Sequence, residues 1–235
     1  MTLRANQAGR DRWVESIAAR TRPGATVLDV GAGECRYRPL FDHCDYRAHD
    51  FASYEGTTDG LFAEPWEYGR LDYVSDITDI PVDGDTFDVV LCTEVLEHVP
   101  RPLDAIRELA RITRLGGKVY LSAPLGSGLH QEPFHFYGGF TPHFYEYAFS
   151  DCGLVTDSIA ANGGFFQQLA QELERAQSIR AVCAPELRRK PLGLLLRLMA
   201  SHAVTSRLLA LDDRLRIREF TVGYHVEATK VPVPS

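Results

Sequence analysis

Residues 126–149 hold a cluster of side chains that could do proton chemistry. His130, His135 and His143 lie among phenylalanines and tyrosines, with Gln131 beside the first of them. Histidine changes its charge near neutral pH, and aromatic walls with a few polar groups are typical of small-molecule pockets. The histidine spacing does not match the H-E-x-x-H pattern of a helical zinc site. The segment therefore predicts a small-molecule pocket in which a histidine acts as a general base and no metal is bound.

A second group of candidate residues lies near the N-terminus, in the stretch "VLDVGAGECR" at residues 27–36. Asp29, Gly31 and Gly33 follow one another at alternate positions, directly after an apolar run that predicts a buried strand. Two glycines here allow a ligand to approach the backbone closely, and the carboxylate can attract a cationic group. The alternatives are a tight turn that needs positive φ and a helix N-cap at Asp29.

The ligand of this turn is either a dinucleotide or a nucleoside without a pyrophosphate. The dinucleotide fingerprint G-x-G-x-x-G requires a third small residue, and Arg36 stands at that position. Asp50 follows Gly33 by 17 residues (50 − 33) at the end of the next predicted strand, near the usual spacing for an acid that binds ribose hydroxyls. Asp45 is the neighbouring alternative.

The order of motifs over residues 73–124 resembles the class I S-adenosylmethionine-dependent methyltransferases, particularly their type 11 branch. "YVSDITDIPVDGDTFDVVLCTEVLEHV" leads into a predicted helix, a Gly–Gly pair and a further strand, and the resemblance covers roughly residues 20–160 together with "GYHVEATK" near the C-terminus. The resemblance implies a seven-stranded sheet whose last strand is antiparallel. It also implies S-adenosylmethionine as the cofactor and S-adenosylhomocysteine as the product.

Site residues follow from the resemblance position by position. Asp29, Gly31 and Gly33 would form the first binding loop, and Asp50 would bind the ribose. Asp76 would accept a hydrogen bond from the adenine amine while Ile77 packs on the adenine ring, although a loop cap is the other interpretation of Asp76. The methionine end would be lined by Cys92 and Thr93, with Glu94 beside them.

The acceptor side is assigned from the histidine-rich segment. His130 is the first candidate for the general base and His135 is the second. We expect the substrate to be contacted by His98, Gln131, Tyr137 and His143. Each histidine could instead be structural. Some relatives carry a "Y-R-Y-T" stretch here, but Gly138–Gly139 replaces its arginine. Some relatives use a similar Glu–His set for a divalent ion, and Glu94, Glu97 and His98 could do that here, which we do not expect.

The elements that must position these residues alternate between short apolar strands and helices. Strand signals cover residues 26–30, 45–49, 72–75, 87–92, 118–123, 154–159 and 222–229, and helices are expected before the first strand and over residues 101–117, where Gly116–Gly117 would supply the stop. The alternation predicts an α/β fold, a doubly wound Rossmann-like and mostly parallel sheet. Residues 51–70 are expected to be a loop.

The chain is predicted to be a single methyltransferase domain, residues 1–235, with a helical cap at residues 165–216 inserted before the last strand. The leucine-rich helices of this cap could pack on the core, form a homodimer face or lie on a membrane surface. No apolar run is long enough to span a membrane.

Composition restricts the partners and the compartment. The 235 residues carry a formal net charge of −7, so a nucleic acid is not an expected partner. Five cysteines without a C-x-x-C pair, and a start without a signal-peptide core, indicate a cytoplasmic protein. We therefore expect methyl transfer to an O or N atom of a small molecule, such as a sugar, a polysaccharide precursor or a secondary metabolite. The rivals are an NAD-dependent oxidoreductase, a cofactor-binding module without catalysis and a methyltransferase for a macromolecule.

Overall fold

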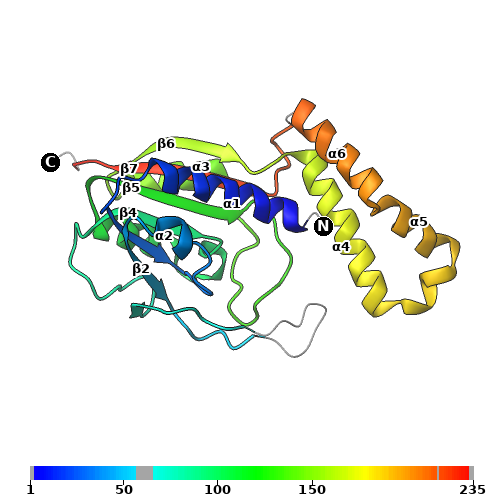
Figure 1. Cartoon of the computed structure of the whole chain (residues 1–235), viewed down its shortest axis with the longest axis horizontal. Coiled ribbons are helices and arrows are strands. Elements are labelled where there is room, and N and C mark those ends of the chain that lie inside the picture. Colours follow the sequence, from blue (N-terminus) through cyan, green and yellow to red (C-terminus); the bar gives the residue numbers. More distant parts are fainter. Residues whose placement is uncertain (1–2, 57–65, 216, 233–235) are drawn as a thin grey trace. The chain divides into compact units, whose positions relative to one another are not determined.

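The computed structural model describes residues 3–56, 66–215 and 217–232 (Figure 1). Its strands are β1 (Thr26–Val30), β2 (Asp45–Asp50), β3 (Tyr73–Val74), β4 (Phe87–Thr93), β5 (Thr113–Pro124), β6 (Leu154–Ala161) and β7 (Gly223–Lys230). Its α-helices are α1 (Leu3–Arg20), α2 (Pro102–Ile112), α3 (Pro142–Ser150), α4 (Phe165–Cys183), α5 (Pro191–Met199) and α6 (His202–Leu215). Short 3₁₀ turns are η1 (Arg38–Phe41), η2 (Leu96–His98) and η3 (Pro185–Arg189).

The strands form one seven-stranded sheet in the order β3-β2-β1-β4-β5-β7-β6. The strands β1 to β5 pair in parallel, and β7 runs antiparallel to β5 from Lys118↔Thr229 to Pro124↔Gly223. Strand order reverses between β1 and β4, so the carboxyl ends of these two strands border a crevice where ligands of open α/β sheets bind. The predicted Rossmann-like fold with an antiparallel last strand is confirmed.

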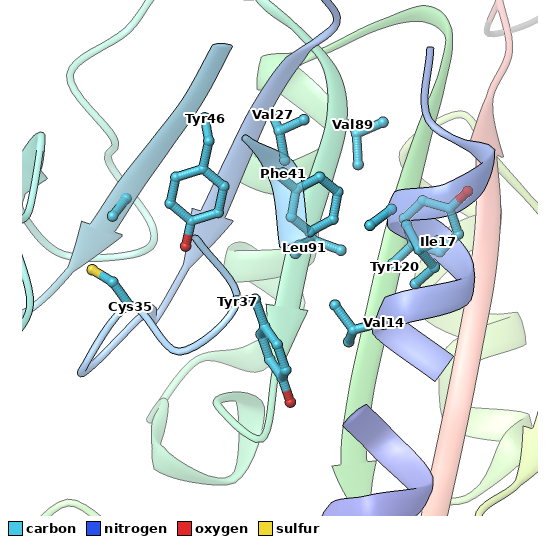
Figure 2. Packing of buried hydrophobic residues seen from close by; sticks show 12 residues of the cluster. Val14, Ile17, Val27, Cys35, Tyr37, Phe41, Tyr46, Val89, Leu91 and Tyr120 are labelled. Carbon is cyan, nitrogen blue, oxygen red and sulfur yellow. The ribbon is translucent and has the colours of Figure 1, made fainter. Parts of the chain in front are cut away.

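One face of the sheet is covered by the second half of α1 (Figure 2). Val14 and Ile17 of this helix are fully buried against side chains from β1, β4 and β5, among them Val27, Leu91 and Tyr120. These strands are apolar along most of their length because a parallel sheet has no solvent-facing side to accommodate polar residues. The packing fixes the level at which β1 and β4 end, and with it the position of the glycine turn.

The helix expected over residues 101–117 is shorter than predicted. α2 ends at Ile112, and Thr113 already has extended φ/ψ and pairs with Phe87 as the first residue of β5. The Thr113 hydroxyl donates to the carbonyl of Leu109 at 2.7 Å and so satisfies one of the last helical carbonyls. Gly116 and Gly117 therefore lie in the irregular first part of β5 and do not stop the helix. The prediction of the Gly–Gly pair as a stop was wrong.

The expected loop and the expected helical insertion are both seen. Residues 51–56 and 66–70 contain neither helix nor strand, and residues 57–65 lie outside the described part of the chain. The segment before β7 consists of α4, η3, α5 and α6. The described residues form two compact units, one of residues 3–12, 161–215 and 217–222 and the other of residues 13–56, 66–160 and 223–232. The predicted cap role of the insertion stays a prediction.

Two further expectations concern cysteines and membrane spans. All five cysteines are free thiols, as the odd number and the spacing predict. In the described part of the chain, none of the helices alone has both the length and the apolar composition of a membrane span. The pair α5 and α6 reaches both only when taken together, and these two helices meet at a bend of 44°.

Candidate active site

A pocket of about 280 Å³ lies at the carboxyl ends of β1, β2, β3 and β4. It is contained within the larger compact unit. Six of the residues singled out in the sequence are part of its wall: Gly31, Asp50, Asp76, Ile77, His98 and Gln131. The same wall includes Glu94, which the sequence placed beside the methionine end. Motifs spread over 100 residues of sequence thus meet at one edge of the sheet.

The glycine turn after β1 requires its small residues for two separate reasons. Gly31 has φ of 72° and Gly33 has φ of 51°, a region that strains any residue with a Cβ. A Cβ on Gly31 would also overlap the side chain of Val95, and one on Gly33 would lie 2.9 Å from the Trp66 ring. The amides of Gly31 and Ala32 donate to the carbonyl of His49 at 2.8 and 3.0 Å, which ties the turn to β2.

Asp50 closes the turn from the end of β2. One carboxylate oxygen accepts the Gly33 amide at 2.9 Å and the other accepts the Ala52 amide at 3.0 Å. Asp45, the alternative ribose acid, begins β2 at the opposite end of the strand and pairs with Arg47 at 3.0 Å. The geometry therefore favours Asp50 as the acid of the pocket.

Asp29 lies beneath the turn and is not part of the pocket wall. Its carboxylate is buried and accepts a hydrogen bond of 2.6 Å from the hydroxyl of Tyr46. Burial raises the pKa of Asp29 to about 7, while the hydrogen bond from Tyr46 works in the opposite direction. The carboxyl is therefore close to the midpoint of its titration at neutral pH. Its predicted contact with a cationic ligand stays a prediction.

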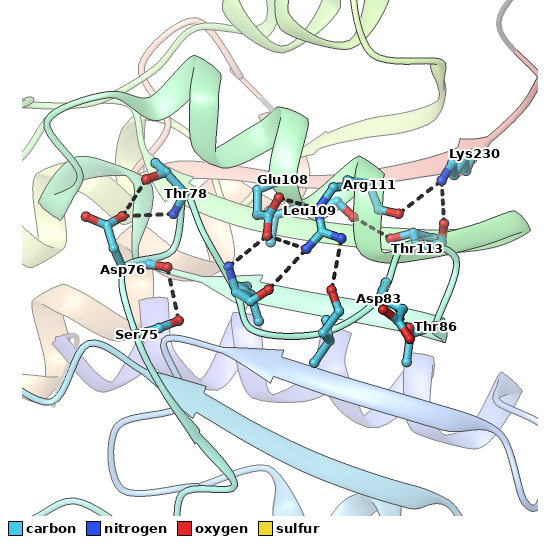
Figure 3. Close-up of polar contacts among 12 residues, drawn as sticks. Ser75, Asp76, Thr78, Asp83, Thr86, Glu108, Leu109, Arg111, Thr113 and Lys230 are labelled. Atoms are coloured by element: carbon cyan, nitrogen blue, oxygen red, sulfur yellow. Dashed lines mark hydrogen bonds and ion pairs between the residues drawn. The ribbon is translucent and has the colours of Figure 1, made fainter.

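Asp76 and Ile77 lie on a turn after β3 that α2 holds in place (Figure 3). One carboxylate oxygen of Asp76 accepts both the amide and the hydroxyl of Thr78 at 2.8 Å. The hydrogen bond from the Thr78 amide lowers the pKa of Asp76, so this side chain is an anion at neutral pH. Asp76 is thus a loop cap and also part of the pocket wall, so the two interpretations from the sequence do not exclude each other.

The rest of this turn is bound to α2 by a buried acid and its neighbour. Glu108 accepts the amide of Ile80 at 2.7 Å, and the guanidinium of Arg111 donates to the carbonyls of Ile80 and Val82 at 3.1 and 2.9 Å (Figure 3). Arg111 also contacts Glu108 at 2.6 Å. These hydrogen bonds join the turn to α2 and so hold Asp76 in its position above the sheet.

The end of β4 supplies an unusual backbone conformation. Cys92 is fully buried, and burial raises the pKa of its thiol far above the ordinary value, so it remains neutral. Glu94 has φ of 55°, which is uncommon outside glycine, and its carboxylate accepts the hydroxyl of Ser122 at 2.7 Å. Such strain is retained where the surroundings impose it, often at ligand sites. Cys92 and Thr93 precede Glu94 in the chain and are not part of the pocket wall, so their predicted ligand contacts stay predictions.

Several wall residues were missed because the sequence gave them no motif. Residues 51–56 and 66–70 appeared to be only a polar loop, yet Tyr54, Trp66 and Tyr68 line the pocket. The Tyr68 hydroxyl joins the two pieces, since it accepts the amide of Tyr54 and donates to its carbonyl, both at 3.0 Å. The amide of Gly69 then binds the carbonyl of Gly33 at 2.9 Å. Three aromatic residues within 15 positions were the available signal.

The four histidines predicted to lie on the acceptor side divide into two groups. His98, His130 and His135 lie together, with ring centroids 4.8 Å apart for His98–His130 and 4.5 Å for His130–His135. His98 belongs to the pocket wall, and burial lowers its pKa to about 4, with the two neighbouring histidines acting in the same direction. Its ring is therefore neutral at pH 7. His143 lies apart on α3, with a side chain that is 90% exposed beside Glu146.

Only some of the residues predicted to contact the acceptor thus lie together at the pocket. Gln131 and His98 reach the pocket wall, whereas His130 and His135 are not part of it and contact the ring of His98. Tyr137 donates its hydroxyl to the carbonyl of Pro100 at 3.1 Å and is not part of the wall. His143 does not reach the pocket either. The structure therefore gives no support to substrate contacts by Tyr137 and His143.

The pocket offers hydrogen-bonding groups that a nucleoside could use. Within the described residues, Nε1 of Trp66 and Nδ1 of His49 are buried atoms without a hydrogen-bond partner, and both side chains belong to the wall. Asp50 and Asp76 add acceptors, and Ile77 adds an apolar surface. Buried polar groups are normally satisfied, so the donor of Trp66 and the acceptor of His49 fit a polar ligand.

Comparison with known proteins agrees with this geometry. Residues 28–121 match the family model described as "Methyltransferase domain". The ubiquinone biosynthesis O-methyltransferase of Vibrio parahaemolyticus is 34% identical over 112 residues, which is 42% of this chain and 43% of that relative. The chain therefore matches less than half the length of this curated relative.

Solved structures share the fold at low sequence identity. The [4+2]-cyclase SpnF has a TM-score of 0.54 at 17% identity, over 95% of this chain and 81% of that one. The phosphoethanolamine N-methyltransferase 2 of Haemonchus contortus, solved with S-adenosyl-L-methionine, has a TM-score of 0.55 at 14% identity, over 95% of this chain and 52% of that one. At such identities these matches show the fold alone.

The strand order and the pocket define a class I methyltransferase fold with its ligand site at the strand ends. Residues 28–121 carry a methyltransferase domain of the type 11 branch, and S-adenosylmethionine is the cofactor of such domains. The predicted fold and cofactor are confirmed, and the family match is confirmed for these residues.

Proposed function

We propose that this protein transfers a methyl group from S-adenosylmethionine to an oxygen or nitrogen atom of an uncharged small molecule. The cofactor supplies an electrophilic methyl group on a sulfonium centre. The chain supplies a binding surface made of Gly31, Asp50, Asp76 and Ile77, all of which face one pocket. In the assignment made from the sequence, Asp50 accepts from the ribose hydroxyls and Asp76 from the adenine amine, and both carboxylates attract a ligand of net positive charge.

The charge of the pocket carries the proposal about the acceptor. Asp50, Asp76 and Glu94 are part of the described wall, whereas no lysine or arginine contributes to it. An anionic acceptor would meet carboxylates without a partner for its own charge. Gly138–Gly139 stands where some relatives have an arginine, which points the same way. A neutral acceptor, or an amine, therefore fits best.

The aromatic side chains favour a ring as the acceptor. Phe51, Phe134 and Phe136 belong to the same wall, and the ring centroids of Phe51 and Phe134 lie 6.0 Å apart at an edge-to-face angle of 75°. Aromatic walls of this kind accommodate flat apolar groups. The relative from Vibrio parahaemolyticus is named as an O-methyltransferase, and this supports a ring hydroxyl before an amine. A sugar, a polysaccharide precursor and a secondary metabolite all remain within the proposal.

The histidine cluster is proposed to receive the acceptor proton. Nδ1 of His130 lies 2.9 Å from the carbonyl of Gly128, and a carbonyl can only accept, so Nδ1 carries the hydrogen and Nε2 keeps its lone pair. The new O–C bond forms as the methyl–sulfur bond breaks, with the electron pair left on sulfur. The hydroxyl proton passes to Nε2 of His130 and then to solvent.

The donor half of the proposal is tested by calorimetry with S-adenosylhomocysteine and with NAD. We expect binding of the first and none of the second. Tight binding of NAD alone would favour the oxidoreductase alternative and contradict the proposal.

The acceptor half is tested with methyl-labelled cofactor and matched sets of ring compounds. The sets carry a free hydroxyl, a hydroxyl with a carboxylate, or an amine. We expect labelled product from the neutral hydroxyl set and little from the carboxylates. Cofactor binding without any product from small molecules or from macromolecules would favour a binding module without catalysis.

A homodimer through residues 165–216 is proposed on separate grounds. α5 exposes Leu192, Leu195 and Leu198 by 50% or more. An apolar helix face of this kind is usually covered by another surface. Light scattering of the full chain tests the proposal, and a monomer at high protein concentration would contradict it.

A further inference from the structure

The three clustered histidines come from two parts of the chain that are joined by backbone hydrogen bonds. His98 ends η2, whereas His130 and His135 belong to the segment between β5 and α3. The amides of Phe136 and Tyr137 donate to the carbonyl of Glu97 at 2.9 and 3.2 Å. These bonds hold the histidine-rich segment against η2, so the cluster follows from the backbone and not from side-chain mobility.

Three side chains of this cluster place metal-binding atoms close together. One carboxylate oxygen of Glu97, one ring nitrogen of His98 and one of His130 all lie within 4.8 Å of one another. Nε2 of His98 is 3.9 Å from Oε1 of Glu97. Zinc bonds of about 2.0–2.2 Å require donor atoms about 3.4 Å apart in a tetrahedron. A small movement of the exposed His130 side chain would therefore complete the set.

The ring orientations favour metal binding through Nε2 of both histidines. Nδ1 of His98 lies 2.8 Å from the carbonyl of Phe134, and Nδ1 of His130 lies 2.9 Å from the carbonyl of Gly128. Each Nδ1 therefore carries the hydrogen, and each Nε2 has a free lone pair. Metal-binding histidines almost always donate their other N–H to a carbonyl or a carboxylate, which fixes the ring. Here both rings already have that arrangement.

We propose that Glu97, His98 and His130 bind a divalent transition metal of the zinc class. Two imidazoles and one carboxylate form the ligand set of many catalytic zinc sites, which leave one position open for water or substrate. Magnesium and calcium prefer oxygen ligands, so two nitrogen donors select against them. The set differs from the Glu94–Glu97–His98 alternative considered from the sequence, since Glu94 instead accepts the Ser122 hydroxyl at 2.7 Å.

The position of the site suggests what the metal would do. His98 is a ligand in this set and also part of the pocket wall, next to Gln131 and Phe134. If the open position of the metal faces this wall, it would bind a hydroxyl oxygen of the acceptor and lower the pKa of that hydroxyl. In the metal-bound protein, His130 would hold the metal, and the metal would replace it as the group that activates the acceptor. This last step rests on the proposed function, whereas the metal binding does not.

The test uses the full chain after removal of bound metals with a chelator. Zinc is titrated by competition calorimetry, and cobalt is titrated while its visible absorption is recorded, because tetrahedral cobalt absorbs strongly. We expect one metal per chain and no competition by excess magnesium. His98→Gln and His130→Gln should each weaken zinc binding by more than about tenfold, since loss of outer-shell partners alone costs about 10–100-fold.

His43→Gln is the matched control. The His43 side chain is exposed and contacts the carbonyl of Thr21 at 3.1 Å, away from the cluster, so this variant should bind zinc like the unchanged protein. If His98→Gln fails to fold, His130→Gln still decides, because its side chain is exposed. Equal zinc affinity in His130→Gln and in the unchanged protein would overturn the proposal.

A second titration separates this proposal from the proposed function. S-adenosylhomocysteine is titrated into the metal-free and the zinc-loaded protein. Zinc binding without binding of S-adenosylhomocysteine would contradict the methyl-transfer proposal and leave the metal site standing. Binding of S-adenosylhomocysteine without binding of zinc would overturn the metal site and leave the methyl-transfer proposal standing.

Discussion

The donor side and the acceptor side of the pocket are built in different ways. The donor side consists of turns at strand ends. The amide of Gly31 donates to the carbonyl of His49, and the amide of Gly33 donates to the carboxylate of Asp50, both at the end of β2. The acceptor side consists of residues 125–141, which contain no helix or strand and are held mainly by the carbonyls of Glu97 and Pro124. The donor geometry is thus a consequence of the sheet, whereas the acceptor geometry depends on a few loop contacts. This difference allows one cofactor site to serve different acceptors.

The largest effect should come from Gly31→Val, which attacks the donor side. Its Cβ would overlap Val95, and the backbone has φ of 72°, where a β-branched residue is strongly strained. We expect affinity for S-adenosylhomocysteine to fall by more than about a hundredfold, corresponding to about 3 kcal/mol. Calorimetry measures this loss directly.

Gly24→Ala is the control for strain without overlap. Gly24 also has positive φ, at 75°, but a Cβ there meets nothing within 4 Å. It should cost about 1 kcal/mol of stability and leave cofactor affinity unchanged. Equal loss of binding in both variants would mean that backbone strain, and not the approach of Val95, explains the effect.

His130→Ala tests the acceptor side. Turnover of the methyl acceptor should fall by about a hundredfold, the lower range for loss of a general base or of a metal ligand that activates the acceptor. Affinity for the cofactor should stay within about twofold, because His130 is not part of the pocket wall. Steady-state kinetics with calorimetry measures both. Unchanged turnover on the true acceptor would remove His130 from the mechanism.

Asp50→Ala should weaken cofactor binding by more than about tenfold, or about 1.4 kcal/mol. The variant removes acceptors for the ribose and also for the Gly33 amide. Asp45→Ala is the matched control on the same strand, since its carboxylate pairs with Arg47 at the far end of β2. Loss of affinity in Asp45→Ala alone would reverse the assignment.

The smallest effect should come from Tyr46→Phe, which removes the buried hydrogen bond to Asp29 beneath the glycine turn and changes the free energy of unfolding. In the folded protein the pKa of Asp29 is about 7, above its ordinary value of 3.8, so the favourable contribution of the protonated carboxyl is complete below about pH 4 and disappears as the pH rises through 7. The hydrogen bond from Tyr46 favours the charged carboxylate. Its removal should therefore cost more at pH 8 than at pH 5, by about 1 kcal/mol.

Urea unfolding at the two pH values measures this difference. Tyr145→Phe is the control, because the buried Tyr145 hydroxyl has no hydrogen-bond partner within the described residues. This control should show no pH-dependent loss. A loss in Tyr46→Phe that is the same at both pH values would mean that Asp29 does not titrate in this range.

The donor side could be predicted from the sequence because each of its parts is local. Gly31 and Gly33 follow one strand, Asp50 ends the next, and Asp76–Ile77 follows the third, so strand order alone brings them to one edge. Local sequence also predicted the glycine requirement and the free cysteines, whereas the antiparallel last strand was implied by the resemblance. In contrast, the end of α2 was misplaced, because pairing of Thr113 with Phe87 prevails over helix propensity.

Only the tertiary structure decided which residues meet across long sequence separations. Trp66 lies over Gly33, and His98 lies beside His130, because loops without a repeating pattern fold back through a few backbone hydrogen bonds. Spacing within the segment 130–143 predicted no metal site, and the metal site proposed above needs Glu97 and His98, which lie outside this segment in η2. The sequence by itself thus determined the methyl donor, through residues fixed by a regular sheet. The acceptor side depends on contacts between loops, which no local pattern encodes.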